Sequence, residues 1–391
     1  MSNKVKSGLA PKLRFPEFRQ SGAWKSESLS PYLEDCSGRV PSDTDLPIYS
    51  STREGLKRQD AYFDGRVLQN KNEYGAVPPD CFVYRHMSDD GQFKFNINQT
   101  GGDIAVSKEY PVFRTKGLNP IFLLAKLNDG VDFKEFAFSQ KAGGTRTRLY
   151  FSRLREWQTP LPSPSEQQKI ADCLSSLDEL IAAQARKVDA LKTHKKGLMQ
   201  QLFPREGETQ PRLRFAEFAT PWNETKLEDL CSSVSSGRDQ IDSDGIFDLY
   251  GSTSVIGKTK NASFNGERIL VARVGANAGM LTKAKGSFGV TDNTLVVNLN
   301  PSFSIDFMFH YLGNLNINKL IFGSGQPLIT GSILKNLSIQ VPVDVEQQRV
   351  SVCLSSLDEL IIAQISELEA FSTHKKGLMQ QLFPASTDGE E

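Results

Sequence analysis

Several stretches of the sequence have the residue types of a catalytic or phosphate-binding site, but each fails at the spacing that the chemistry requires. The segment Gly251–Thr259 ends in Gly-Lys-Thr like a phosphate-binding P-loop, yet five residues separate its two glycines where that loop has four. The base-holding loop of an adenine methyltransferase has Pro at its third position. Asn-Pro-Ile at 119–121 and Asn-Pro-Ser at 300–302 both lack it. The four histidines are too dispersed for a metal site. We therefore expect no catalytic residues and no metal.

Cysteine usage and hydropathy narrow the class of protein. The five cysteines are single and form no Cys-x-x-Cys pair, which favours a reducing compartment over disulfides or zinc. No apolar run reaches the eighteen or so residues that a membrane span needs. The first fifteen residues also lack the apolar core of a secretion signal. The sequence thus predicts a soluble, cytoplasmic protein.

The formal charge is zero, with 46 basic and 46 acidic residues, but it is unevenly distributed along the chain. Residues 1–160 carry 24 basic and 19 acidic side chains, whereas residues 341–391 carry 3 basic and 9 acidic ones. Affinity for nucleic-acid phosphates scales with the cations that a protein presents. A chain that bound DNA alone by charge would be more basic, so a partner should supply much of any phosphate contact.

An internal repeat organises the whole sequence. CLSSLDELI at 173–181 recurs letter for letter at 353–361, and THKKGLMQQLFP at 193–204 recurs at 373–384. Both pairs are offset by 180 residues. Because these segments have stayed nearly identical while the intervening regions differ, we expect them to perform the same task twice.

The front half of each copy is also related, with a different offset. PKLRFPEF at 11–18 matches PRLRFAEF at 211–218, and IYSST at 48–52 matches LYGST at 249–253. The first copy is longer in its middle, and residues 70–138 have no evident counterpart in the second copy. We expect the two domain surfaces to differ in this region.

The near-identical segments belong to two long helices with a heptad pattern. A 39-residue helix from Ser165 to Phe203 would be about 58 Å long. Apolar residues recur at alternating spacings of four and three, which is typical of a coiled-coil seam. Since a domain separates the helices, the pattern favours an antiparallel pair. The proposed seam and docking positions are Leu174, Leu177, Ile181, Gln184, Leu191, Leu198, Leu354, Leu357, Ile361, Gln364, Phe371 and Leu378.

Polar residues at equivalent places in the two seams allow more than one interpretation. Gln184 and Gln364 can fix the register of the pair. Lys195 and Lys375 each stand two residues before a glycine. These lysines fit either a kink or frayed last turn, or a docking point for another subunit.

The order of domain, Glu-Gln-Gln-headed helix ending in GLMQQLFP, second domain and second such helix resembles the specificity (S) subunit of type I restriction-modification systems. The resemblance covers essentially the whole chain. It includes the LRF-x-x-F segments at 13–18 and 213–218, and the Gly-rich turns at 143–146 and 323–326. It implies an α+β fold, with two mixed α/β target-recognition domains separated by two long antiparallel helices that form a coiled coil with a pseudo-twofold internal repeat.

The resemblance also implies a role and a set of partners. Each recognition domain would read one half of a bipartite target in double-stranded DNA. The helices would set the spacing and dock two adenine methyltransferase (modification) subunits, and two restriction subunits would join through these methyltransferase subunits. The chain itself would bind no cofactor, because S-adenosylmethionine and ATP belong to the partner subunits. The expected domains are 1–160, a spacer helix in 161–205, 206–340, and a second spacer helix with an acidic tail in 341–391.

Side-chain chemistry indicates which residues could read DNA bases. Arg and Lys form paired hydrogen bonds with guanine, while Asn and Gln form them with adenine. The base-reading candidates are Arg53, Arg146, Arg148, Lys258, Arg273, Asn277 and Gln326. The candidates for phosphate contacts are Lys57, Arg58, Lys260, Lys283 and Lys285. A solvated surface role remains the alternative for each residue. For the whole chain, the alternatives are a protein-binding adaptor and an enzyme with an unrecognised site.

Overall fold

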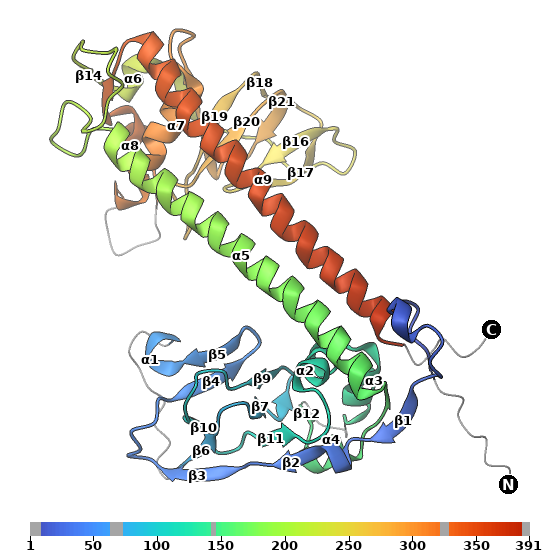
Figure 1. The fold of residues 1–391 in the computed structure, drawn as a ribbon. Coiled ribbons are helices and arrows are strands. Elements are labelled where there is room, and N and C mark those ends of the chain that lie inside the picture. Colours follow the sequence, from blue (N-terminus) through green and yellow to red (C-terminus); the bar gives the residue numbers. More distant parts are fainter. Residues whose placement is uncertain (1–8, 63–72, 142–145, 321–327, 385–391) are drawn as a thin grey trace. The chain divides into compact units, whose positions relative to one another are not determined.

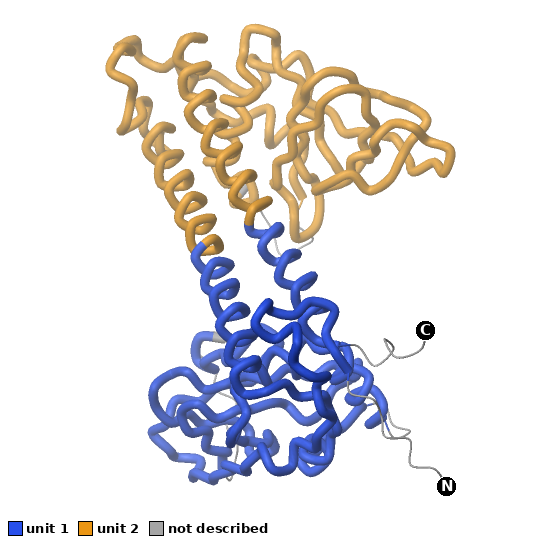
Figure 2. The backbone as a smooth tube through the Cα atoms, turned by 45° about the vertical axis from the view of Figure 1, so that its right-hand side comes forward, with its two compact units in different colours: residues 1–183, 368–391 blue, residues 184–367 orange. Residues whose placement is uncertain are grey.

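The computed structural model describes residues 9–62, 73–141, 146–320 and 328–384, and it divides into two compact units (Figure 2). Unit 1 comprises residues 1–183 and 368–391, and unit 2 comprises residues 184–367. Each long helix contributes to both units. Helix α5 spans Pro164–Leu202 and helix α9 spans Asp344–Leu382, each with 39 residues. A compact unit is therefore a domain together with part of each helix.

Unit 1 is a mixed domain of short strands and helices (Figure 1). Its elements before α5 are η1 (Pro16–Phe18), β1 (Lys25–Ser28), η2 (Ser30–Tyr32), β2 (Leu33–Asp35), β3 (Gly38–Pro41), β4 (Tyr49–Thr52), β5 (Gly55–Arg58), α1 (Gln59–Tyr62), β6 (Glu73–Val77), β7 (Phe82–Tyr84), β8 (Met87–Ser88), β9 (Phe95–Ile97), β10 (Ile104–Ser107), β11 (Val112–Thr115), α2 (Pro120–Asp129), α3 (Val131–Ser139), β12 (Thr147–Arg148), α4 (Phe151–Glu156) and β13 (Gln158–Leu161).

The alternation of side chains along the strands builds two cores in unit 1. In the sheet β2-β11-β7-β9, Phe82 and Phe113 belong to a large aromatic core that also contains residues of α2 and of both long helices. Val83 and Val112 point to the other face, where they join a smaller core with Val106 of the sheet β10-β6-β3. Because successive strand residues face opposite sides, one sheet separates the two cores.

Unit 2 has the same layers built from different strands. Its elements between α5 and α9 are β14 (Asn223–Lys226), α6 (Leu227–Leu230), β15 (Cys231–Ser236), β16 (Phe247–Tyr250), β17 (Val255–Thr259), β18 (Phe264–Asn265), β19 (Arg268–Ala272), β20 (Leu281–Ala284), β21 (Ser287–Val290), β22 (Thr294–Leu299), α7 (Ile305–Asn314), η3 (Ile317–Leu320), α8 (Gly331–Lys335) and β23 (Ser338–Val341). The sheet β15-β22-β19-β20 separates a large core on the helix side, with Ile269 and Val271, from a smaller core with Leu270 and Phe288.

Segments of both long helices enter the core of each unit. In unit 1, Ile170 and Leu174 near the start of α5 share a core with Leu382 at the end of α9. In unit 2, Val350 and Leu354 near the start of α9 share a core with Leu202 at the end of α5. The start of one helix thus packs with the end of the other, and the predicted antiparallel pairing and α+β fold class are confirmed.

One sequence-based expectation needs correction. Residues 70–138 are not without a counterpart in the second copy, because α2 corresponds to α7. Asn119 caps α2, and its backbone N–H donates to Gln167 Oε1 at 3.0 Å. Ser304 caps α7, and its N–H donates to Gln347 Oε1 at 3.2 Å. Sequence comparison misses the relation because the packing conserves apolar positions rather than identities.

Among the described helices, none is both long and apolar enough to cross a membrane.

Candidate nucleic-acid interface

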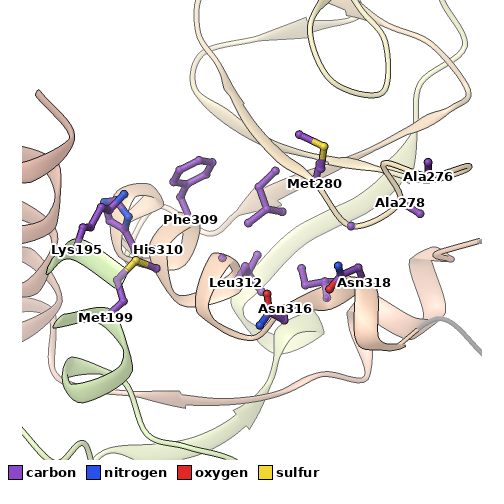
Figure 3. Close-up of a pocket in the computed structure, with 14 residues that line it drawn as sticks. Lys195, Met199, Ala276, Ala278, Met280, Phe309, His310, Leu312, Asn316 and Asn318 are labelled. Atoms are coloured by element: carbon purple, nitrogen blue, oxygen red, sulfur yellow. The ribbon is translucent and has the colours of Figure 1, made fainter. Parts of the chain in front are cut away.

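A pocket of about 320 Å³ in unit 2 lies between α5, α7 and the loop that precedes β20 (Figure 3). Lys195 and His310 line one side, and Met280 and Asn318 line the other. Both Ser355 and Asp358 lie near the same His310 nitrogen, with Nε2 3.5 Å from Ser355 Oγ and 3.7 Å from Asp358 Oδ2. A Ser-His-Asp triad uses the two ring nitrogens separately. The arrangement therefore does not activate the serine.

His310 is held neutral by its surroundings. Its side chain is only 2% exposed, and burial lowers its pKa to about 4. The positive charge of nearby Lys195 acts in the same direction, whereas Asp358 opposes it. Within the described ranges, no group of three or more His, Cys, Asp or Glu side chains is placed to hold a metal ion.

The P-loop-like segment Gly251–Thr259 folds as the turn and second strand of a hairpin. Strand β17 pairs antiparallel with β16, and Gly251 N–H donates to Ser254 O across the turn. A phosphate-binding P-loop instead leads into a helix whose N-terminus faces the phosphate. The segment thus belongs to a sheet. It resembles a nucleotide site in sequence but not in structure.

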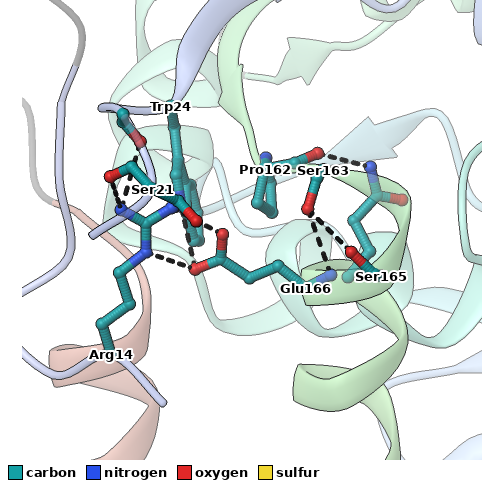
Figure 4. A network of polar contacts seen from close by, with 9 residues as sticks. Arg14, Ser21, Trp24, Pro162, Ser163, Ser165 and Glu166 are labelled. Atoms are coloured by element: carbon teal, nitrogen blue, oxygen red, sulfur yellow. Dashed lines mark hydrogen bonds and ion pairs between the residues drawn. The ribbon is translucent and has the colours of Figure 1, made fainter. Parts of the chain in front are cut away.

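A buried ion pair joins the start of α5 to the domain of unit 1 (Figure 4). Arg14 donates through Nε and Nη2 to the two oxygens of Glu166, both at 2.7 Å. Trp24 Nε1 donates to Glu166 Oε1 at 3.3 Å. The Glu166 side chain is 2% exposed, so this fork-to-fork contact fixes the helix against the domain. We call Arg14, Trp24 and Glu166 the unit 1 joint.

Unit 2 repeats this contact with the equivalent residues. Arg214 donates to Glu346 through Nε and Nη2, again at 2.7 Å, and Trp222 Nε1 donates to Glu346 Oε1 at 3.1 Å. We call Arg214, Trp222 and Glu346 the unit 2 joint. The two joints explain why the LRF segment, the tryptophan and the Glu-Gln-Gln start of the helix all occur twice.

In unit 1, two base-reading candidates from distant parts of the sequence meet at one loop. Arg53 lies in the tight turn of the β4–β5 hairpin, and its Nη2 contacts both oxygens of Asp90 at 2.6 and 2.7 Å. Arg146 Nε donates to Asp89 Oδ1 at 2.7 Å. Sequence reasoning missed both aspartates, because the only local signal at 88–91 was a turn-forming Ser-Asp-Asp-Gly.

The other unit 1 candidates lie close to this loop or on the hairpin. Arg148 is exposed on β12, which pairs with β8 directly before the two aspartates. On β5, Lys57 pairs with Glu54 at 3.6 Å and Arg58 pairs with Asp60 at 2.9 Å. Exposed pairs of this kind are worth about 0–1 kcal/mol, so a competing anion could displace the carboxylates at low cost.

In unit 2, Arg273 and Asn277 lie on the loop that follows β19. Arg273 N–H donates to Asn293 O at 2.9 Å, and Ser252 Oγ donates to the same oxygen at 3.4 Å. Arg273 is therefore brought next to the turn of the β16–β17 hairpin, while Asn277 is exposed. Arg273 Nε is buried without a hydrogen-bond partner among the described residues. Gln326 lies outside the described residues.

The lysines of unit 2 point to separate carboxylates. Lys258 Nζ pairs with its cross-strand neighbour Asp248 at 2.8 Å. Lys260 pairs with Asp242 and Asp244 at 3.1 and 3.3 Å. Lys283 is directed to Asp306 at the start of α7, and Lys285 is exposed. The structure does not gather these lysines at one point as it gathers Arg53 and Arg146.

All proposed seam positions are buried or half-buried. Gln184 Nε2 donates to Gln364 O at 2.9 Å and also contacts Gln364 Oε1 and Glu367. The two seam lysines form equivalent pairs between the helices. Lys195 Nζ lies 2.5 Å from Asp358 Oδ1, and Lys375 Nζ lies 2.5 Å from Asp178 Oδ1. Gly197 and Gly377 lie inside continuous helix, so neither helix is frayed at these lysines.

The identity between the helices extends to residues that packing does not require. Leu180 and Leu360 are equivalent and are 52% and 43% exposed. The pairs Glu179/Glu359, His194/His374 and Lys196/Lys376 are likewise identical and exposed. Between the identical segments, at residues 182–192 and 362–372, exposed residues differ, with Arg186 aligned to Ser366. Packing in the seam therefore does not account for the identity of these segments.

Comparison with protein families finds one that spans most of the chain. The model of the type I restriction modification DNA specificity domain matches residues 85–193 and 220–370, so the domain occurs twice.

Two relatives and two solved structures are similar to the chain. The type I restriction enzyme EcoprrI specificity subunit of Escherichia coli is 31% identical over 127 residues, which is 32% of each chain. The MjaX specificity subunit of Methanocaldococcus jannaschii is 24% identical over 78% of this chain and 79% of its own. A type I restriction-modification S subunit from M. genitalium has a TM-score of 0.62 at 14% identity, covering 97% of this chain and 100% of that one. A chain from a type I system studied for complex assembly has a TM-score of 0.55 at 14% identity, covering 93% and 98%.

Proposed function

Because the chain belongs to the family of type I restriction-modification specificity subunits, we propose that it is the DNA-reading, non-catalytic subunit of a cytoplasmic complex. Each domain would read one half of a bipartite target in double-stranded DNA. The observation that carries this proposal is the contrast between two repeated joints and two different sets of exposed polar loops. A repeated scaffold with unlike loops suits two readers of unlike sequence.

The experiment is to map methylated adenines in the source genome with and without this chain. We expect a two-part motif that disappears when the chain is deleted. Domain exchange sharpens the result, because replacing residues 223–341 with the corresponding residues of another family member should change one half of the motif and leave the other. An unchanged motif after either manipulation would exclude the chain as the reader.

We further propose that the identical segments of the helices dock two copies of one partner, the adenine methyltransferase subunit, and that restriction subunits join through it. Leu180 with Glu179, and Leu360 with Glu359, offer the same exposed apolar and acidic surface in each unit. S-adenosylmethionine and ATP would be bound by the partners.

A charge placed on this surface should disrupt docking. Leu180→Glu together with Leu360→Glu is expected to abolish co-purification with the methyltransferase subunit, and each single change should remove one copy. Arg186→Ser is the matched control, because the second helix already has Ser366 at the equivalent exposed position. If both leucine variants assemble normally, the docking surface lies elsewhere.

The helices are also proposed to set the gap between the half-sites. Seven residues added to the middle of each helix would keep the seam in register and lengthen each helix by about 10 Å. That length corresponds to about three base pairs of B-DNA. We expect the unread gap in the methylation motif to grow while both half-sites stay the same.

A further inference from the structure

Loop 88–92 of unit 1 is built around a fixed carboxylate. Asp90 Oδ1 accepts hydrogen bonds from Ser88 Oγ at 2.8 Å and from Gln92 N–H at 3.1 Å, in addition to its contact with Arg53. These bonds, with that of Ser88 as the largest cause, lower the pKa of Asp90 to about 2. Ser88 is itself buried and lies on β8, so the carboxylate is tied to a strand rather than to a free loop.

The strands on both sides hold the loop in place. Thr147 and Arg148 of β12 pair with Ser88 and Met87 of β8, which puts Arg146 directly beside the loop. The β4–β5 hairpin that carries Arg53 is anchored from another sheet, because Asn96 Nδ2 donates to Ser51 Oγ at 2.8 Å and to Thr52 O at 3.2 Å. Three segments of the chain therefore converge at this loop.

The geometry leaves both guanidinium groups able to bind something else. A guanidinium has five N–H donors, and recognition of guanine uses two of them on one edge. Asp89 engages Nε of Arg146, so the pairing does not require its terminal nitrogens. Asp90 engages Nη2 of Arg53, so the pairing does not require Nε or Nη1. Each carboxylate thus restrains an arginine without using its whole donor set.

We propose that Asp89 and Asp90 are positioning residues, which hold Arg146 and Arg53 in the orientation that reads bases of the half-site bound by unit 1. This inference rests on the proposed DNA-reading function. Ordering a long side chain on binding weakens affinity about two- to tenfold. Fixing the arginine before DNA arrives removes most of that loss for the correct target. The same negative charges repel the phosphates of all DNA equally.

Positioning and simple repulsion predict opposite signs for target DNA. Asp90→Asn should weaken binding to the target about two- to tenfold, because Arg53 loses its restraint. It should leave binding to a scrambled duplex unchanged or stronger, because a negative charge is lost. Asp60→Asn is the matched control. It frees Arg58, a phosphate candidate, and should strengthen both complexes or leave both unchanged.

The test uses the complex of the full chain with its methyltransferase subunit. The two probes are a duplex with the motif mapped by adenine methylation and the same duplex with one half-site scrambled. Arg53→Ala should lower the target preference about 5- to 150-fold. In the Arg53→Ala background, Asp90→Asn should cause no further loss, since a residue acting through Arg53 cannot act without it. Ser88→Ala, which removes the bond that fixes Asp90, should reproduce part of the effect.

The outcomes separate this inference from the function on which it rests. Equal losses from Asp90→Asn with and without Arg53 would overturn the positioning role, as would tighter target binding by Asp90→Asn alone. An unchanged preference in the Arg53→Ala and Arg146→Ala variants would also overturn it, although DNA reading would stand. A wild-type complex without preference for the mapped motif would overturn the proposed function itself.

Discussion

The two joints share the same contacts among their arginine, tryptophan and glutamate, whereas the loops of the two units share almost none. Arg14 and Arg214 bind Glu166 and Glu346 with the same atoms at the same 2.7 Å distances. At the loops, unit 1 holds arginines with the carboxylates of a neighbouring loop, and unit 2 pairs lysines along a hairpin. The comparison separates the residues that build the scaffold from those that are free to change with the target.

The chemistry of the two regions explains this difference. A buried carboxylate tolerates no substitution that leaves its arginine unpaired, because an uncompensated buried charge is expensive. Exposed ion pairs contribute about 0–1 kcal/mol each, so a loop can exchange them with little effect on stability. Divergence is therefore expected where pairs are exposed, and identity where they are buried.

The largest effect should come from breaking a joint. Glu346→Ala leaves Arg214 and Trp222 with buried unpaired donors and should lower the free energy of unfolding of unit 2 by about 3–5 kcal/mol. Glu166→Ala should do the same in unit 1. Urea denaturation followed by hydrogen exchange, read separately for residues of each unit, measures both.

The control for the joint is Glu217→Ala, which removes an exposed partner of Arg349 at 3.8 Å and should change stability by less than about 0.5 kcal/mol. Equal loss of protection in both units from a single joint variant would show that the joints do not act locally.

The next effect depends on pH and distinguishes the units. His310 has a pKa of about 4 in the folded chain, against 6.5 ordinarily, because it is buried. The unfolded chain therefore binds the extra proton between pH 6.5 and 4. Stability is full above pH 6.5 and falls as the pH drops through this window, by up to about 3 kcal/mol. Unit 1 has Ala125 at the equivalent position of α2 and should lack this contribution.

Chemical denaturation at a series of pH values, again with hydrogen exchange for each unit, measures this difference. His310→Gln serves as the control, since it should remove the extra pH dependence of unit 2 and leave unit 1 unaffected. If unit 2 of the wild type keeps its stability from pH 6.5 to 4, His310 is not buried as a neutral ring.

The two long helices could be predicted from the sequence because helices that pack together carry apolar residues at regular spacings. The seam residues, the two 39-residue helices and their antiparallel pairing all follow from the heptad spacing and the 180-residue offset. For the joints, the sequence shows only that the arginine, tryptophan and glutamate occur in both copies of the repeat. Which glutamate binds which arginine depends on how segments about 130 to 150 residues apart fold together, and no local pattern encodes that.

The candidate interface was less predictable. Residue chemistry pointed to Arg53 and Arg146, but their convergence on one loop is a property of the tertiary fold. Asp89 and Asp90 were not suspected, since acidic residues in a turn have many ordinary reasons to be there. The phosphate contact of Lys283 stays a prediction; its amine is directed to Asp306 and lies 5.3 Å from the ring centre of Phe309.

A smaller effect tests whether the polar contact in the helix seam can be replaced without loss of stability, unlike the buried ion pairs of the joints. Gln184→Ala removes the donor to Gln364 and should cost about 1 kcal/mol. Leucine at both 184 and 364 should recover that loss, because two apolar residues satisfy each other in a coiled-coil seam. Thermal denaturation of Gln184→Leu, Gln364→Leu and the double leucine variant measures the coupling between the two positions. Additive losses in the double variant would argue against direct contact.

The smallest effect comes from the lysine pairs, which occur in both units and differ only in their neighbours. Lys195→Met and Lys375→Met each remove a partly exposed pair and should cost about 0.5 kcal/mol at pH 7. Below pH 6.5 the two should diverge. Lys195 helps to hold the pKa of His310 low, so its removal raises that pKa and weakens the acid sensitivity of unit 2. Lys375 has no such neighbour, because Ala125 stands at the position equivalent to His310. Denaturation at pH 7 and pH 5 compares the two variants. Identical pH dependence would mean that Lys195 does not act on His310.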